Sequence, residues 1–121
     1  MESKEIAIMS ARAMDARRGT NITVLRLDDL TTLTDYFVVG TGNSRAQTQA
    51  MADSVEDTLS EDGIRPNRIE GLQEGRWILL DYGSVIVHIF QDDDRGFYGL
   101  ERLWADAPAL PIEEVLPHLV E

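Results

Sequence analysis

Two apolar runs, residues 77–80 and 85–90, flank a short polar break that contains Gly83. β-branched and aromatic residues dominate both runs, and a glycine in such a break is typical of a β-hairpin. A loop of two or four residues would place Leu80 opposite Val85 in the paired strands. The pattern therefore predicts two antiparallel strands joined by a tight turn.

Side chains alternate between the two faces of a strand, so this hairpin has two chemically different faces. One face is purely aliphatic, as expected of a core, and consists of Ile78, Leu80, Val85, Val87 and Ile89. The other face mixes aromatic, imidazole and carboxylate side chains with aliphatic ones, namely Trp77, Leu79, Asp81, Ile86, His88 and Phe90. We interpret the mixed face as the working surface.

Helical and extended patterns alternate along the rest of the chain. Helices are expected over residues 2–18, 44–63, 97–105 and 111–121, the last interrupted by Pro117, and strands over residues 21–28, 35–41 and 67–72. The unbroken apolar run at 35–41 indicates an interior strand buried on both faces. Ser44 and Gln47 have the spacing of a capping box. The strand, helix, strand order over residues 35–72 indicates a parallel pair with a right-handed crossover.

The chain has 121 residues, a length that fits one domain with a sizeable core. It has no cysteine, which excludes disulfides and thiolate metal sites. No apolar run approaches the roughly 18 residues of a membrane helix, and no basic-then-apolar leader opens the chain. We therefore expect a cytoplasmic protein.

The formal net charge is −11, from 22 acidic and 11 basic residues. Phosphate backbones repel such a chain, which disfavours direct nucleic-acid binding. A basic protein partner would instead be attracted and steered towards it. A charge that only serves solubility, or that reflects a salt-rich habitat, explains the same value equally well.

Three features have ligand-binding chemistry, and each has a simpler structural explanation. The junction at residues 40–44 could present free amides to an anion, but it lacks the lysine of a Walker A loop and the third glycine of a dinucleotide motif. A turn followed by a helix cap explains it better. The adjacent aspartates at residues 92–94 lack the spacing of a calcium loop, and His88 and His118 lack that of a zinc site. We expect no metal and no cofactor.

Catalytic side chains are not evident in the sequence. There is no nucleophile elbow and no convincing Ser/His/Asp set, and a hairpin turn is sufficient to explain Ser84. Asp28, Asp29 and Asp35 could act as paired carboxylates, but their positions are typical of turns and strand starts. The sequence therefore favours a protein that is not an enzyme.

The two tryptophans have different expected roles. Trp104 shares a helical face with Leu100 and Leu103, which favours packing in a core. Trp77 lies on the mixed face of the hairpin, and aromatic residues are enriched at the energetic centres of interfaces. The alternative for Trp77 is that a helix of its own chain covers it.

Four blocks of the chain, in this order and spacing, resemble the ribosomal silencing factor family, also called RsfS or Iojap. They are residues 35–53 (DYFVVGTGNSRAQTQAMAD), Glu70-Gly71, residues 77–90 (WILLDYGSVIVHIF) and residues 95–104 (RGFYGLERLW). The resemblance covers about residues 3–107. We accordingly assign residues 1–107 to a silencing-factor-like α/β domain and residues 108–121 to a C-terminal tail.

The resemblance implies a mixed five-stranded sheet flanked by helices, related to nucleotidyltransferases but without their catalytic acids. It implies a non-enzymatic protein that binds the large ribosomal subunit through ribosomal protein L-fourteen. Because that protein lies where the small subunit docks, a bound factor blocks subunit joining and represses translation under nutrient limitation or in stationary phase. Family members often form homodimers when free, and organellar relatives assist large-subunit assembly.

Applied to this sequence, the resemblance places the partner contact on the mixed face of the hairpin. The expected contact residues are Trp77, Asp81, Tyr82, His88 and Phe90, with Asp81 pairing a basic side chain of the partner and Tyr82 at the loop edge. Two other functions stay open. One is a large-subunit assembly factor, and the other is a nucleotidyltransferase-like enzyme that binds phosphate at residues 40–44 and Mg²⁺ through nearby acids.

Overall fold

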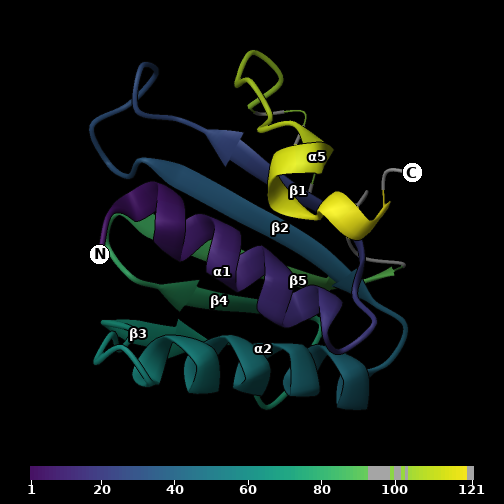
Figure 1. Cartoon of the computed structure of the whole chain (residues 1–121). Coiled ribbons are helices and arrows are strands. Elements are labelled where there is room, and N and C mark those ends of the chain that lie inside the picture. The colour runs from purple at the N-terminus through teal and green to yellow at the C-terminus, as the bar shows by residue number, and fades with distance from the viewer. Residues whose placement is uncertain (93–98, 100–101, 103, 120–121) are drawn as a thin grey trace.

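The computed structural model describes residues 1–92, 99, 102 and 104–119. It contains a mixed five-stranded sheet with the strand order β1-β2-β5-β4-β3, and two long helices pack on one face of this sheet (Figure 1). The elements are α1 Ser3–Asp15, β1 Thr20–Arg26, β2 Tyr36–Gly42, α2 Arg45–Ser60, β3 Arg68–Glu70, β4 Trp77–Asp81, β5 Val85–Gln91, α5 Ile112–Val115 and the 3₁₀ turn η1 Pro117–Leu119. The predicted small α/β domain with a mixed five-stranded sheet is confirmed.

The main core lies between the sheet and the helices α1 and α2. All five aliphatic residues predicted for the core face of the hairpin are fully buried there, together with Met14, Met51, Val55 and Leu59 from the helices. Every residue of β2 is buried, which confirms the prediction of an interior strand. The strand has this position because β1 pairs with one of its edges and β5 with the other.

The predicted register of the hairpin is wrong by two residues, although the assignment of its faces is right. Leu80 lies opposite Val87, not Val85, and Trp77 lies opposite Phe90. The backbone N–H of Tyr82 donates to the carbonyl of Val85 at 2.9 Å, so the hairpin loop consists of two residues, Gly83 and Ser84. A shift of two positions leaves each side chain on its original face, because the period of a strand is two.

The predicted parallel pairing of the strands before and after α2 is also wrong. The strand that pairs in parallel with β2 is β5, with Phe37 opposite Ile86 and Val39 opposite His88. Among the described strands, β3 lies at the far edge of the sheet and pairs with β4, antiparallel. The three-residue β3 is polar and short, whereas β5 is almost fully apolar and can fill the interior position beside β2.

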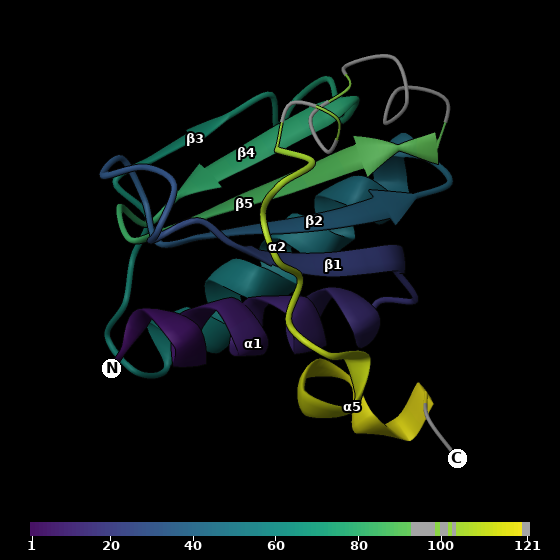
Figure 2. The same cartoon turned by 90° about the horizontal axis from the view of Figure 1, so that it is seen from above.

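The C-terminal segment passes over the sheet and then returns to the helical side. Ala109 forms a bridge with Leu25 of β1, and the N–H of Leu110 donates to the carbonyl of Val24 at 2.9 Å. Figure 2 shows this segment passing β5, β2 and β1 on its way to α5. The predicted tail helix is split into α5 and η1 at Pro117, and Val115 and Leu116 belong to the main core. The helix predicted over residues 97–105 lies largely outside the described residues.

Candidate functional site

The face of the sheet opposite α1 and α2 is partly covered by the chain itself. A second apolar cluster lies on this face, formed by Leu25, Leu27, Phe37, Val39 and Phe90. Trp104 and Ala107 pack against this cluster, and the Trp104 and Phe37 rings meet edge to face at 5.7 Å between centroids. Trp104 therefore has a packing role, as the sequence predicts, and it packs against this cluster together with Trp77 and Ile86.

The half of this face over β4 and the start of β5 stays partly accessible. Trp77, Leu79 and Ile86 are each only partly buried. The long helices α1 and α2 pack on the opposite face. Neither of these two helices covers Trp77, whereas the helix predicted over residues 97–105 lies largely outside the described residues. A row of apolar side chains on an accessible sheet face is a feature of interaction sites.

Trp77 is held in place by two of the other predicted contact residues. Its ring stacks on Phe90 at 5.2 Å between centroids, and its indole Nε1 donates a hydrogen bond to His88 Nδ1 at 3.0 Å. Phe90 is 0 % exposed and His88 is 3 % exposed. The structure thus brings Trp77, His88 and Phe90 together as predicted, but it places His88 and Phe90 beneath Trp77 and out of reach of a docking partner.

Burial sets the protonation state of His88. It lowers the pKa of the imidazole to about 4, so the ring is neutral at pH 7. Since Nδ1 accepts the indole hydrogen, the ring proton resides on Nε2. The Nε2 atom is buried and has no hydrogen-bond partner among the described residues. His88 is therefore a neutral packing residue whose role is to orient Trp77.

Asp81 and Tyr82 point to different sides of the hairpin. The Asp81 carboxylate accepts hydrogen bonds from Arg68 Nε at 3.1 Å and from the backbone N–H of Gly83 at 2.8 Å. Tyr82 packs against the core on the helical side, where burial and the nearby Glu56 carboxylate raise the pKa of its hydroxyl. Asp81 thus lies on the accessible face with internal partners, and Tyr82 does not share a face with Trp77.

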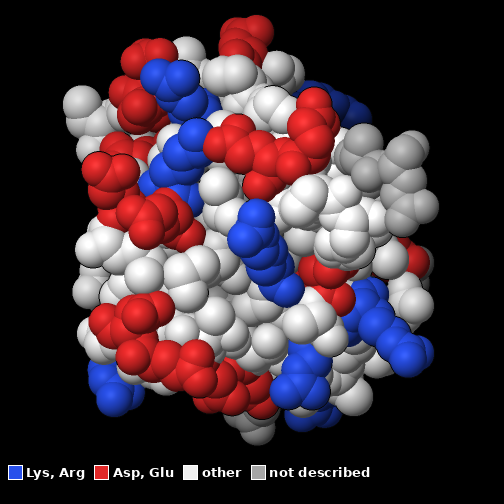
Figure 3. Space-filling view, in the orientation of Figure 1, with Lys and Arg blue, Asp and Glu red and all other residues white. Residues whose placement is uncertain are grey.

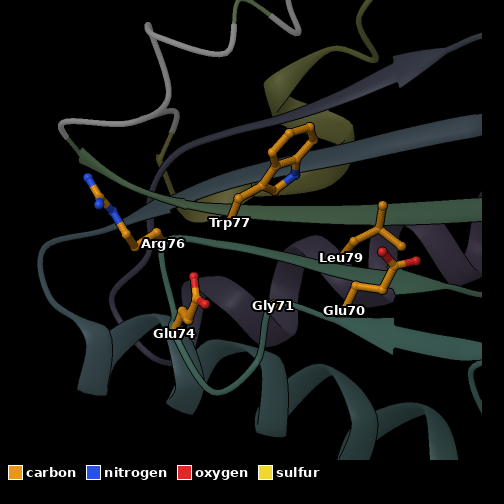
Figure 4. Close-up of a pocket in the computed structure, with 6 residues that line it drawn as sticks. All are labelled: Glu70, Gly71, Glu74, Arg76, Trp77 and Leu79. Atoms are coloured by element: carbon orange, nitrogen blue, oxygen red, sulfur yellow. The ribbon is translucent and has the colours of Figure 1, made fainter.

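A pocket of about 390 Å³ lies beside Trp77 at the β3–β4 end of this face. It is lined by Glu70, Gly71, Glu74, Arg76, Trp77 and Leu79. Trp77 and Leu79 point to the same side of β4, and the carboxylates of Glu70 and Glu74 lie on either side of the space in front of them (Figure 4). The lining thus combines an apolar floor with the guanidinium of Arg76 and two carboxylates, of which that of Glu70 pairs with Arg68.

Sequence reasoning placed Leu79 and Ile86 on this face but did not include them among the contact residues. It missed Glu74 and the pocket altogether. The alternation of β4 is sufficient to identify Leu79, whereas no local pattern indicates that residues 71–76 fold back beside Trp77. The only available signal is the pair of glycines, Gly71 and Gly75, which marks a turn.

The glycine-containing junction before α2 has the structure of a helix cap. Ser44 Oγ accepts from the backbone N–H of Gln47 at 3.1 Å, as predicted. The Gln47 side chain accepts from the N–H of Asn43 at 2.6 Å, one residue earlier than in a standard capping box. These amides have internal partners, which favours the structural explanation over an anion site.

The remaining candidate residues have separate structural roles. Asp28 and Asp29 both pair with Arg26, at 2.8 and 3.5 Å, and His118 lies 2.9 Å from Asp15. Of the acidic run at 92–94, two residues lie outside the described part of the chain. Within the described part, no group of three or more metal-ligating side chains comes together. Among the described helices, none combines the length and apolar character needed to cross a bilayer.

Comparison with known proteins identifies close relatives over nearly the whole chain. A ribosomal silencing factor of Bacillus subtilis is 40 % identical over 113 residues, which are 93 % of this chain and 96 % of that protein. The silencing factor of Halalkalibacterium halodurans is 35 % identical over 96 % of this chain and 99 % of its own length. A mouse protein named for mitochondrial assembly of the ribosomal large subunit is 31 % identical over 69 % of this chain and 38 % of its own length.

Solved structures agree with the sequence comparison. A crystal structure from Chromobacterium violaceum superposes with a TM-score of 0.84 at 36 % identity, covering 87 % of this chain and 88 % of the other. A crystal structure from Bacillus halodurans superposes with a TM-score of 0.79 at 33 % identity, covering 89 % and 98 %. The family described as "Ribosomal silencing factor during starvation" matches residues 1–120. This chain therefore belongs to the ribosomal silencing factor family, whose members are regulatory proteins and not enzymes.

Proposed function

We propose that this protein represses translation by binding ribosomal protein L-fourteen on the large ribosomal subunit and blocking the joining of the small subunit. The block is steric and involves no catalytic step. Repression operates under nutrient limitation or in stationary phase, when protein synthesis has to slow. The protein acts in the cytoplasm and forms a homodimer when it is not bound to the ribosome.

The observation that carries this proposal is the accessible half of the sheet face around Trp77. Trp77, Leu79 and Ile86 are partly buried on β4 and β5, on the side that α1 and α2 leave uncovered. Trp77 is preorganised by Phe90 and His88. A rigid aromatic side chain at the centre of an accessible apolar patch is typical of an interface hot spot.

The five expected contact residues take different roles in this proposal. Trp77 contacts the partner directly, and His88 and Phe90 support it from below. Asp81 lies at the edge of the contact, where a basic partner residue competes with Arg68 for its carboxylate. Tyr82 fixes the hairpin end against the helical core and contacts the partner only at the rim.

The charge of the chain suits a basic ribosomal protein. The net charge is −11, and carboxylates form a band over α2 on the helical face (Figure 3). Beside Trp77, Glu74 forms no ion pair with any described residue. An exposed carboxylate near an indole ring favours an arginine or lysine of the partner.

A role in large-subunit assembly is the second candidate function. It is favoured by the similarity to the mouse protein named for assembly of the mitochondrial large subunit. The same surface serves both functions, because each requires binding to the large subunit. They differ in the particle that is bound, which is a mature subunit for silencing and an immature one for assembly.

Sedimentation of the tagged protein with purified ribosomal subunits tests the proposal. We expect it to co-migrate with mature large subunits and not with small subunits. Trp77→Ala should strongly reduce co-migration while the far-UV circular dichroism spectrum stays unchanged. Binding to immature particles alone would favour the assembly function, and binding to neither particle would contradict both.

A further inference from the structure

The loop that connects β3 to β4 forms one wall of the pocket beside Trp77. This Gly71–Gly75 loop begins and ends with a glycine in the left-handed region, at φ values of 75° and 70°. The N–H of Gly75 donates to the carbonyl of Gly71 at 2.9 Å, which closes the loop on itself. The loop contributes Gly71 and Glu74 to the lining of the pocket.

Both glycines lie in close contact with their surroundings. A Cβ atom on Gly71 would stand 2.1 Å from the carbonyl oxygen of Trp77. A Cβ atom on Gly75 would stand 2.8 Å from Arg45 Cγ and 3.0 Å from Thr48 Oγ1, on α2. The loop is thus pressed between the backbone of the residue at the centre of the site and the second long helix.

Two adjacent side chains of α2 hold this loop by its backbone carbonyls. Gln49 Nε2 donates to the carbonyls of Leu72 and Gln73 at 2.9 and 3.2 Å. Thr48 Oγ1 donates to the carbonyl of Gly75 at 2.7 Å, and Thr48 is fully buried. Residues on the helical side of the sheet therefore fix a wall of a pocket that opens on the other side.

We propose that Thr48 and Gln49 are positioning residues for the partner-binding surface, acting through the Gly71–Gly75 loop. This inference rests on the proposed function, since it assumes that the partner docks at Trp77. A loop without these bonds samples open conformations, and ordering it again lowers the affinity for the partner. Neither residue lines the pocket beside Trp77, so their effect on binding is indirect.

The chain supplies a matched control for Gln49. Gln47, two residues earlier on α2, donates in the same way to two consecutive backbone carbonyls, those of Arg17 and Arg18, at 3.2 and 3.0 Å. These carbonyls belong to the turn after α1, which does not line the pocket. Gln49→Ala and Gln47→Ala each remove a pair of side-chain hydrogen bonds to consecutive carbonyls of a loop, and Gln47→Ala also removes the bond from the N–H of Asn43.

The test compares Gln49→Ala, Gln47→Ala and Trp77→Ala by their dissociation constants for mature large subunits. Hydrogen exchange of the amides of residues 72–75 is measured in parallel by mass spectrometry. We expect Gln49→Ala to speed exchange in the loop and to weaken binding roughly three- to tenfold. Gln47→Ala should change neither quantity, and Trp77→Ala should weaken binding more strongly than Gln49→Ala.

Two substitutions of Thr48 test by rescue whether its hydroxyl group is what supports the affinity for the large subunit. Thr48→Val removes the hydroxyl at nearly constant volume and should weaken binding, whereas Thr48→Ser keeps the hydroxyl and should restore the affinity. Faster loop exchange in Gln49→Ala with an unchanged dissociation constant would overturn the positioning role alone. An unchanged dissociation constant in Trp77→Ala would overturn the proposed binding surface and the positioning role with it.

Discussion

The indole Nε1 of Trp77 donates a hydrogen bond to Nδ1 of His88 at 3.0 Å, diagonally across the β4–β5 pair. This bond forms only while Nδ1 is unprotonated, so it links the orientation of Trp77 to a neutral His88. The buried position of the imidazole keeps it neutral at pH 7, since it lowers the pKa to about 4. A core histidine thus fixes the residue at the centre of the proposed interface.

This arrangement predicts a loss of stability in mild acid. The pKa of His88 is about 4 in the folded protein and 6.5 in the unfolded chain, so the unfolded chain binds the proton first as the pH falls. The free energy of unfolding should therefore decrease between pH 6.5 and pH 4, by about 3 kcal/mol in total. Urea unfolding of the His118→Gln protein, in which His88 is the remaining histidine, measures this decrease.

The control for this prediction is the His88→Gln, His118→Gln double variant. Glutamine does not titrate in this range, so the extra loss of stability below pH 6.5 should disappear. If both proteins lose stability in parallel, His88 is not the group responsible.

Truncation of Trp77 should weaken binding to the large subunit without unfolding the protein. Loss of a hot-spot aromatic residue costs about 2 kcal/mol or more, which is roughly a thirtyfold rise in the dissociation constant. Trp77→Phe keeps the stacking on Phe90 and should lose less affinity than Trp77→Ala. Fluorescence anisotropy titration of labelled protein with purified large subunits compares the three proteins, and equal affinities would remove Trp77 from the interface.

Neutralising the pocket carboxylate should slow association with a basic partner. Glu74→Gln removes one exposed charge beside Trp77 and should lower the affinity roughly two- to fivefold. Most of the effect should appear in the association rate and should shrink at high salt. Stopped-flow association at two salt concentrations measures this effect. Glu113→Gln on α5 makes the same charge change away from the pocket and should have a smaller effect.

The C-terminal tail should contribute to global stability. Leu116 is 1 % exposed and belongs to the main core, and Arg12 of α1 donates to the carbonyls of Val115 and Glu114 at 2.9 and 3.2 Å. Leu116→Ala should lower the free energy of unfolding by about 2–4 kcal/mol. Leu119 is 58 % exposed, so Leu119→Ala should change it by less than about 0.5 kcal/mol. Urea denaturation measures both free energies of unfolding. A large decrease for Leu116→Ala would show that the tail is part of the core, and a negligible decrease would show that it is not.

The alternation of side chains along β4 and β5 was sufficient to predict which of them share a face, because a shift of the register by two residues does not change the face of any side chain. It could not predict the register itself. The pairing of Leu80 with Val87 depends on the backbone bond between Tyr82 and Val85, which closes a two-residue turn. The pairing of strands that are not neighbours in the chain could not be predicted either. β5 lies between β2 and β4 because its apolar side chains are buried there, and this burial depends on the packing of the whole chain.

The candidate site could be predicted only in part for the same reason. Trp77 was identified because its face is chemically mixed, whereas the burial of His88 and Phe90 depends on what the rest of the chain places around them. The pocket beside Trp77 requires the Gly71–Gly75 loop to pack against α2, and that contact joins residues more than 20 positions apart. Local sequence patterns carry no signal for such a contact.

Occupancy of the large subunit by this protein should prevent subunit joining. Light scattering after mixing large and small subunits, with the protein titrated from zero to saturation, tests it most directly. We predict that joining falls in proportion to occupancy and that Trp77→Ala needs a roughly thirtyfold higher concentration for the same effect. Joining at the normal rate with fully occupied large subunits would contradict the account.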